Sequence, residues 1–294
     1  MKTKMITLHN EKWKASVLPA WGANLIALSY CGEPILRTPP SLSLLDSDSP
    51  YLYGNPLLLP PNRTRDGKFT FDGQEYQLPI NELEHRNHLH GQLYNAPFDV
   101  VEVGQFDLCC RYQNKGERFP FPFTIALHYQ LGSDGLLLKI ELRNDGECPM
   151  PVALGFHTTF VEPEFASVPI GSHWERDDRL LPTGRLLPLI QQQTQLRSGF
   201  CSRGLSIVGY YTASGHTAYI GKFGLETSAE FNQWVLYNGG GGKGFLCVEP
   251  QLCTVDGLNL QGGCRRLEAQ QAERYWLRFF AAALKSHDSL EEGQ

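Results

Sequence analysis

The 294-residue chain lacks long apolar runs and has almost no stretch with the periodicity of an amphipathic helix. No window approaches the roughly 18 consecutive apolar residues that a membrane-spanning helix needs, so no membrane partner is expected. Helix bundles and α/β proteins of this length contain long segments with apolar residues three and four positions apart. Their near absence favours an all-β architecture, which can form one domain of this size.

Excess positive charge is also missing. The chain has 26 lysines and arginines against 31 aspartates and glutamates, for a net charge of −5. Nucleic acids recruit basic surfaces, so we expect no nucleic-acid partner. The eight cysteines form no C-x-x-C pair, and the first residues lack the apolar segment of a signal peptide. These features favour free, mostly buried thiols and a cytoplasmic location.

Turn signals are abundant: Asp-Gly pairs at five places separate short apolar runs, a pattern typical of β-hairpins. From Leu136 to Asn144, apolar residues alternate with charged ones, which predicts a half-buried strand of an antiparallel sheet. We therefore predict one all-β domain over residues 1–285, a large antiparallel β-sandwich, followed by a flexible acidic tail at 286–294.

Other strands are expected at 4–9, 13–18, 24–30, 98–103, 107–113, 124–131, 150–157, 205–211, 217–222, 233–237, 245–249 and 274–280. Single helical turns are expected at 41–45 and 228–231, and long loops at 162–172 and 190–200.

The segment from Asn238 to Gln251 combines a glycine run with a short strand ending at Glu249 and Pro250. Because strand residues alternate between faces, Glu249 shares a face with Phe245 and Cys247. A carboxylate at this strand end is either a solvated surface group or a base beside a ligand. The glycine run lacks the Ser or Thr of a phosphate-binding loop, so we expect it to let the chain pass close to a ligand. In the preceding strand, Trp234 and Tyr237 either pack in the core or form an aromatic wall for a sugar.

Three other segments place polar groups among apolar or small residues. The proline-rich segment 54–65 presents Asn62 and Arg63, whose donors suit sugar hydroxyls or anions. His88 and His90 would share a strand face, but no third metal ligand is evident, so a hydrogen-bonding pair in a polar cleft is preferred. His157 shares its expected strand face with the small residues Ala153 and Gly155, which suggests space for a ligand beside the imidazole.

Taken in order, these segments resemble the aldose 1-epimerase (galactose mutarotase-like) family. The resemblance rests on five short motifs spread over the chain: Pro60-Pro-Asn-Arg63, Leu89-His90-Gly91, Gly155-Phe-His157, Leu181-Pro-Thr-Gly184 and Cys247-Val-Glu249-Pro250. It implies an open sugar-binding cleft on one sheet of a large β-sandwich. It also implies interconversion of the α and β anomers of a free aldose, without cofactor or metal.

Carried over by position, the resemblance makes Glu249 the base that takes the C1 hydroxyl proton and His157 the acid that protonates the ring oxygen. His90 and Arg63 would bind sugar hydroxyls, with Asn62, His88 and Trp234 as further sugar contacts. We expect the Glu249 and His157 side chains to line opposite walls of one hollow. A protonated imidazole beside an ionised carboxylate would suit the reaction. The chain is expected to act as a monomer or homodimer.

The family's sugar-binding Asp downstream of the Leu-Pro-x-Gly motif has no clear counterpart, which leaves the sugar open. A related activity on hexose 6-phosphates would use Arg63, Arg65 and Arg86 to hold a phosphate. A non-catalytic sugar-binding protein on the same fold could dispense with the acid–base pair. A glycoside hydrolase would need two carboxylates around the scissile bond, and Glu141 and Glu162 are poorly placed for that task.

Overall fold

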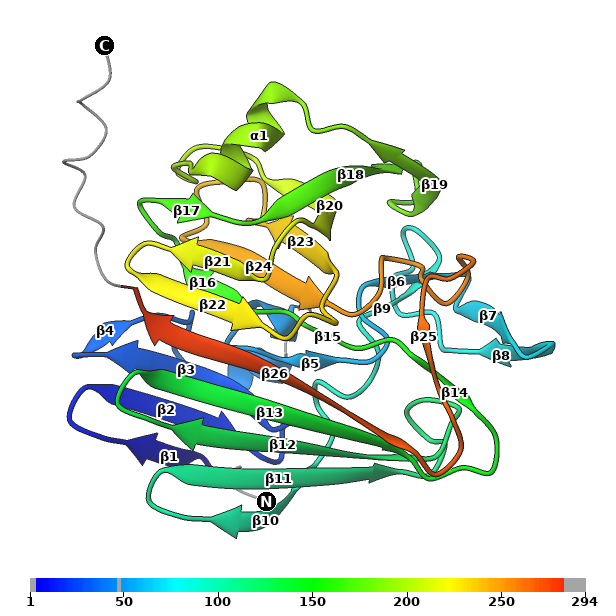
Figure 1. Cartoon of the computed structure of the whole chain (residues 1–294), viewed down its shortest axis with the longest axis horizontal. Helices are drawn as coiled ribbons and strands as arrows, with labels where there is room; N and C mark the ends of the chain where they lie inside the picture. Colours follow the sequence, from blue (N-terminus) through cyan, green and yellow to red (C-terminus); the bar gives the residue numbers. More distant parts are fainter. Residues whose placement is uncertain (1–3, 47–48, 283–294) are drawn as a thin grey trace.

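The computed structural model of the protein describes residues 4–46 and 49–282, so the expected acidic tail at 286–294 lies outside the described residues. Within them, two large antiparallel sheets pack face to face (Figure 1). The first has the strand order β10 (Asp99–Val103), β11 (Asp107–Asn114), β12 (Phe123–Leu131), β13 (Gly135–Asn144), β26 (Ala272–Ala281), β22 (Phe223–Thr227), β21 (Thr217–Ile220) and β17 (Ala166–Ser167).

The second sheet carries the segments of interest for function. Its order is β19 (Pro182–Leu187), β18 (Ile170–Arg176), β20 (Val208–Ala213), β23 (Gln233–Tyr237), β24 (Phe245–Gln251), β15 (Gly155–Phe156) and β5 (Leu57–Leu58), and β16 (Thr159–Val161) also pairs with β24. The predicted all-β sandwich is confirmed.

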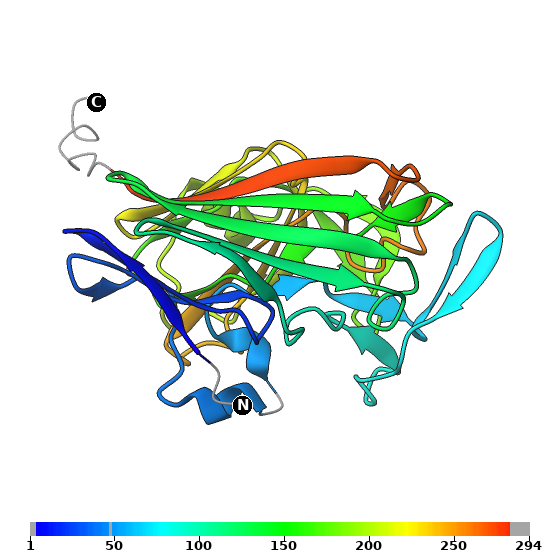
Figure 2. The same cartoon turned by 90° about the horizontal axis from the view of Figure 1, so that it is seen from below.

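Smaller ladders flank the sandwich. An N-terminal sheet contains β1 (Ile6–His9), β2 (Trp13–Leu18), β3 (Asn24–Tyr30) and β4 (Glu33–Pro34). Two-stranded ladders join β6 (Arg63–Arg65) to β9 (Asn87–Leu89), β7 (Lys68–Phe71) to β8 (Gln74–Gln77), and β14 (Met150–Val152) to β25 (Arg265–Leu267). The β7–β8 hairpin projects from the body of the molecule (Figure 2). It turns at Asp72 and Gly73, both with positive φ, as its two-residue loop requires.

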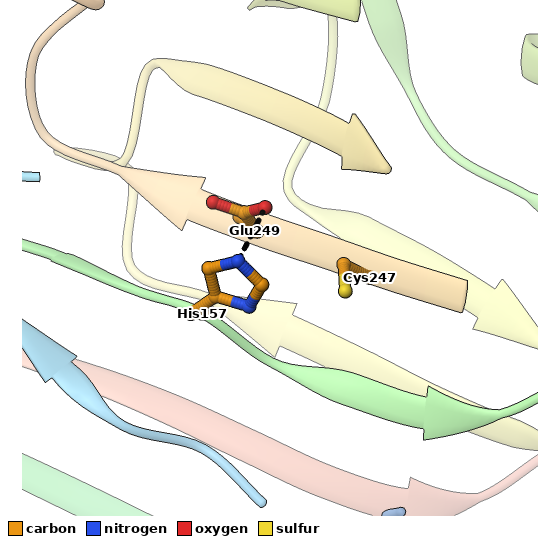
Figure 3. Close-up of side chains that lie close together, drawn as sticks. All are labelled: His157, Cys247 and Glu249. Carbon is orange, nitrogen blue, oxygen red and sulfur yellow. Dashed lines mark ion pairs between the residues drawn. The ribbon is translucent and has the colours of Figure 1, made fainter. Parts of the chain in front are cut away.

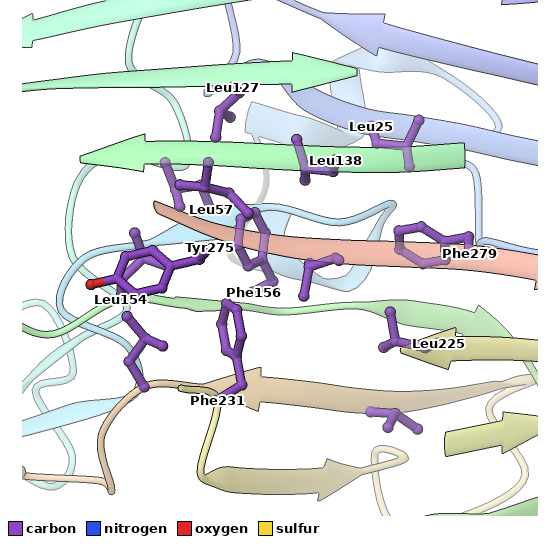
Figure 4. Packing of buried hydrophobic residues seen from close by; sticks show 14 of the residues in the cluster. Leu25, Leu57, Leu127, Leu138, Leu154, Phe156, Leu225, Phe231, Tyr275 and Phe279 are labelled. Atoms are coloured by element: carbon purple, nitrogen blue, oxygen red, sulfur yellow. The ribbon is translucent and has the colours of Figure 1, made fainter. Parts of the chain in front are cut away.

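Strand β13 shows why the sandwich forms. Leu138, Ile140 and Leu142 are buried, whereas Lys139 and Arg143 are exposed on the opposite face. The buried face meets other buried side chains in one large core, among them Phe156 of β15 and Phe231 from the connection between β22 and β23 (Figure 4). The same core takes residues from the N-terminal sheet, including Trp13. The expected single domain over 1–285 stays a prediction.

Several sequence predictions need correction. The expected loop at 190–200 contains helix α1 (Gln191–Ser198), which was missed because Leu196 is its sole buried residue and leaves no apolar period. The expected loop at 162–172 contains β17 and the start of β18. The expected strand 150–157 is divided into β14 and β15, which pair with different partners.

The cysteines differ from expectation in burial. All eight are free thiols, but only Cys110, Cys247 and Cys253 are buried, while Cys31, Cys148 and Cys201 are exposed. No helix in the described ranges is long and apolar enough to cross a membrane.

Truncating the core face of β13 should destabilise the fold. Leu138→Ala removes a fully buried side chain and should lower the free energy of unfolding by about 2–5 kcal/mol. Lys139→Ala, on the exposed face of the same strand, should change it by less than about 0.5 kcal/mol. Urea unfolding of both variants against wild type measures the difference. Equal losses would contradict the assigned orientation of β13.

Candidate active site

Glu249 lies inside strand β24, not at its end. Leu246 and Val248 on the same strand are buried in the core, so alternation places Cys247 and Glu249 on the opposite face, as predicted. The strand continues through Pro250, which pairs with Trp234, to Gln251. Glu249 is only 1% exposed, which rules out the solvated strand-end carboxylate.

The glycine run Gly239–Gly244 closes the β23–β24 turn at the opposite end of β24 from Glu249. Five glycines there have positive φ, which explains the composition of the turn: Gly239, Gly240, Gly241, Gly242 and Gly244. The start of β24 and Glu249 are separated by about 13 Å of extended chain. The turn therefore does not bring the backbone close to Glu249, and its expected approach to a ligand stays a prediction.

His157 follows β15 directly and is placed by the pairing of that short strand. Gly155 pairs with Gln251 of β24, and the His157 backbone N–H donates to the Pro56 carbonyl. A Cβ at position 155 would lie 2.9 Å from both the Gln251 Cγ and the Pro61 Cβ. Gly155 is therefore required by close packing, and the space expected for a ligand at this glycine is filled by protein.

The structure brings Glu249 and His157 into direct contact. His157 Nε2 lies 3.4 Å from Glu249 Oε1 (Figure 3). The expectation that they line opposite walls of a hollow is wrong, because β15 and β24 are neighbours in one sheet. A ligand that contacts both groups would therefore lie across the pair rather than between its two members.

Burial shifts the two pKa values in opposite directions. Desolvation lowers the pKa of His157 to about 4. It raises the pKa of Glu249 to about 8, opposed by the hydrogen bond from Gln251 and the charge of Arg63. At neutral pH the pair thus holds one proton, on Glu249. This reverses the expected protonated imidazole and ionised carboxylate, because both groups are nearly inaccessible to water.

Each member of the pair has a polar neighbour that orients it. The Gln251 amide Nε2 donates to Glu249 Oε2 at 3.2 Å, and Gln251 is itself fully buried. On the other side, Thr159 Oγ1 lies 3.4 Å from His157 Nδ1. Neither residue was singled out in the sequence, although alternation along β24 places Gln251 on the Glu249 face.

His90 lies beside the pair, but His88 does not share its position. His90 has positive φ after β9 ends, so strand alternation no longer applies and the expected common strand face is wrong. The His90 ring centre is 5.1 Å from that of His157 and 4.5 Å from that of Tyr51. His88 Nδ1 instead donates to the Pro79 carbonyl at 2.7 Å.

The His90 ring has a nitrogen that is unpaired in the described part of the chain and a lowered pKa, both of which suit binding of a neutral ligand. Its Nδ1 is buried and has no hydrogen-bond partner within the described residues. Burial, with the charges of His157, Arg63 and His88, holds the pKa of His90 well below its usual value. A neutral imidazole with a spare nitrogen can bond a hydroxyl group.

Most of the Arg63 guanidinium is already committed. Its Nε and Nη2 donate to Glu82, the shortest contact being 2.6 Å. Its Nη1 donates to Asn62 Oδ1 and to the Tyr210 hydroxyl. Of its five N–H groups, about one is left for a ligand. Asn62 is buried with positive φ, and its carbonyl accepts from the His90 N–H.

Trp234 does not face the site. It pairs with Pro250, so it projects to the core face, where it is fully buried. Its Nε1 donates to the Gly215 carbonyl. The half-exposed Tyr237 pairs with Cys247 and shares the site face instead. Of the two aromatic wall candidates, only Tyr237 has the required orientation.

Comparison with known proteins assigns the family. The profile of the family described as aldose 1-epimerase matches residues 4–204, about two thirds of the chain. The chain belongs to the aldose 1-epimerase family. The match covers Asn62, Arg63, His88, His90 and His157 but ends before Glu249.

Two Escherichia coli K12 proteins named as uncharacterized are similar in sequence. YihR is 27% identical over 171 residues, 55% of this chain and 54% of YihR. YphB is 28% identical over 105 residues, 36% of each chain. The aligned part of the chain thus spans about half or less of these relatives.

Several solved structures share the fold over nearly the whole chain. A galactose mutarotase-like protein from Clostridium acetobutylicum has a TM-score of 0.86 at 24% identity, covering 95% of both chains. An aldose epimerase homologue from C. elegans has a TM-score of 0.80 at 16% identity, covering 95% and 99%. Galactose 1-epimerase from Lactobacillus acidophilus NCFM has a TM-score of 0.76 at 17% identity, covering 95% of both. At these identities the likeness shows the fold alone.

Elsewhere, this family member has a hollow of about 820 Å³ on the outer face of the first sheet, lined by Lys139, Glu141 and Trp276 among others. Glu141 there forms an ion pair with Arg274. Glu141 is therefore directed away from the second sheet and from Glu249, which argues against the carboxylate pair of a glycoside hydrolase.

The lowered pKa predicts that the His157 imidazole is neutral under mildly acidic conditions. At about pH 6 the His157 ring should be neutral, because its pKa is lowered to about 4 by burial. The ¹⁵N chemical shifts of the imidazole nitrogens distinguish neutral from protonated rings, and His157→Asn identifies the signal by its loss. Imidazolium shifts at that pH would contradict the lowered pKa of His157.

Proposed function

We propose that the protein is an aldose 1-epimerase that interconverts the α and β anomers of a free aldohexose. This proposal rests on the buried contact of 3.4 Å between His157 Nε2 and Glu249 Oε1, in a chain of the aldose 1-epimerase family. Ring opening needs one proton removed from the C1 hydroxyl and one supplied to the ring oxygen. A pair that shares one proton between a carboxylate and an imidazole meets both needs.

In the proposed reaction, the shared proton first passes from Glu249 to His157 when the sugar binds. Glu249 then accepts the C1 hydroxyl proton, the bond between C1 and the ring oxygen breaks, and His157 protonates that oxygen. The product is the open-chain aldehyde. Rotation about the C1–C2 bond and the reverse proton transfers close the ring as the other anomer. The pair again holds one proton at the end.

Sugar binding is assigned mainly to His90, whose Nδ1 is unpartnered within the described residues. Arg63 adds its remaining N–H group, and Asn62 holds the Arg63 guanidinium. His88 stays a weaker candidate, because its Nδ1 is bonded to Pro79. Tyr237 replaces Trp234 as the aromatic surface for the sugar.

The hexose 6-phosphate alternative is less well supported. Arg63 pairs with Glu82, and Arg65 pairs with Asp177 and Asp256. Carboxylates that already neutralise these guanidinium groups weaken them as phosphate ligands. A non-catalytic sugar-binding protein would not need a buried acid–base pair. The cytoplasmic location and the monomeric or homodimeric state stay predictions.

Removing either proton-transfer group should abolish most catalysis. Glu249→Gln and His157→Asn should each lower kcat by about 10²- to 10⁴-fold, the usual contribution of general acid–base catalysis. Polarimetry of freshly dissolved α-D-glucose and α-D-galactose, corrected for the buffer rate, measures this. Glu141→Gln, a carboxylate change on the outer face of the other sheet, is the matched control and should keep full activity.

The substrate panel decides the proposal. If wild type accelerates anomer exchange of hexose 6-phosphates but of no free aldose, the alternative replaces it. Acceleration of neither class, in a folded protein, would rule out an epimerase acting on these sugars.

The pH dependence of kcat/KM should be bell-shaped. The active pair carries one proton. It gains a second as pH falls through the His157 pKa of about 4 and loses the last as pH rises through the Glu249 pKa of about 8. Activity should therefore fall on both sides of that window. A profile that stays flat from about pH 5 to pH 10 would contradict the role of Glu249.

A further inference from the structure

The face of β24 that carries Glu249 also carries Cys247, two residues earlier. One donor atom each from His157, Cys247 and Glu249 lie within 4.8 Å of one another, and all three side chains are buried. Figure 3 shows the Cys247 and Glu249 side chains on β24 with the His157 ring close beside them. The proposed epimerase reaction gives no task to the Cys247 thiol.

The donor set suits zinc or a similar borderline divalent cation. Zinc binds imidazole nitrogen and carboxylate oxygen at about 2.0–2.2 Å and thiolate sulfur at about 2.3 Å in a tetrahedral arrangement. Those bond lengths require nitrogen and oxygen to be roughly 3.4 Å apart. The separation of His157 Nε2 and Glu249 Oε1 is 3.4 Å. The same bond lengths place sulfur roughly 3.6 Å from the other two donors, whereas the three atoms now lie up to 4.8 Å apart. The Cys247 sulfur would therefore need to move toward them by up to about 1 Å, which a change in its χ1 angle can supply.

Charge balance favours the cation in this buried place. A divalent cation with one thiolate, one carboxylate and one neutral imidazole forms a cluster of zero net charge. Burying a neutral cluster avoids the large penalty for an isolated ion. Calcium and magnesium prefer sets of oxygen ligands, so they are poor candidates for this mixed set.

We propose that His157, Cys247 and Glu249 form an inhibitory site for zinc-like divalent cations, on the same side chains that transfer protons to the sugar. Three protein ligands leave a fourth position for water. A cation there occupies the carboxylate oxygen and the imidazole nitrogen, so neither can accept or donate a proton. The binding claim stands on the donor geometry alone, whereas the inhibition rests on the proposed epimerase function.

Cobalt(II) separates the two claims. It substitutes for zinc and gives an intense charge-transfer absorption when a thiolate is a ligand. Titration of wild type with cobalt chloride should produce this band, and added zinc chloride should remove it. Cys247→Ser should lose the band. His157→Asn and Glu249→Gln should weaken cobalt binding by more than the roughly 10- to 100-fold that loss of an outer partner costs.

Cys253→Ser is the matched control, because Cys253 is also buried and lies in hydrogen-bonding contact with Cys264. It should keep the cobalt band. A band that persists in Cys247→Ser, or that disappears in Cys253→Ser, would place the thiolate ligand elsewhere and overturn the proposal. No band in wild type would overturn it as well.

In the activity arm, micromolar zinc chloride should slow anomer exchange by wild type, and a chelator should restore it. Cys247→Ser should retain exchange activity and be at least about 10-fold less sensitive to zinc. Equal sensitivity of wild type and Cys247→Ser would contradict the inhibitory site. If wild type has no epimerase activity, the proposed function fails, and the cobalt spectra still decide the metal site.

Discussion

The site depends on one constraint: two ionisable side chains are held in contact where water hardly reaches them. Glu249 and His157 come from segments almost a hundred residues apart, and the pairing of Gly155 with Gln251 joins them. Because Gly155 has no Cβ, the Gln251 side chain can pass beside it and bond the Glu249 carboxylate. The absence of a side chain at Gly155 on β15 thus helps to position the Glu249 carboxylate on the neighbouring strand β24.

Burial then determines how the pair behaves chemically. In water, a carboxylate would be ionised and an imidazole partly protonated at neutral pH. Here desolvation disfavours both charges, so the shared proton is held by Glu249. A ligand with polar hydroxyl groups can restore the charge-separated form that proton transfer requires. The same burial bears on both proposals, the acid–base reaction and the divalent-cation site.

Some residues that the family motifs suggest as sugar contacts do not point freely into the site. Arg63 is largely engaged by Glu82 and Tyr210, and Trp234 faces the core. By contrast, Tyr237 and Gln251 share the Glu249 side of the sheet because of the register between β23 and β24. A motif identifies a segment, but the direction of each side chain depends on the pairing of that segment with its neighbours.

The sequence by itself determined the sandwich class, the alternation of β13 and the strand containing Glu249, because apolar periodicity and turn residues are local properties. It did not reveal helix α1, whose polar sequence has no apolar stripe, or the end of β9 before His90. Only the tertiary structure decided that His157 and Glu249 touch, that Gly155 packs against Gln251, and that burial shifts the two pKa values in opposite directions. Contact and desolvation arise from segments far apart in the chain, and no local pattern encodes their distance or their exposure to water.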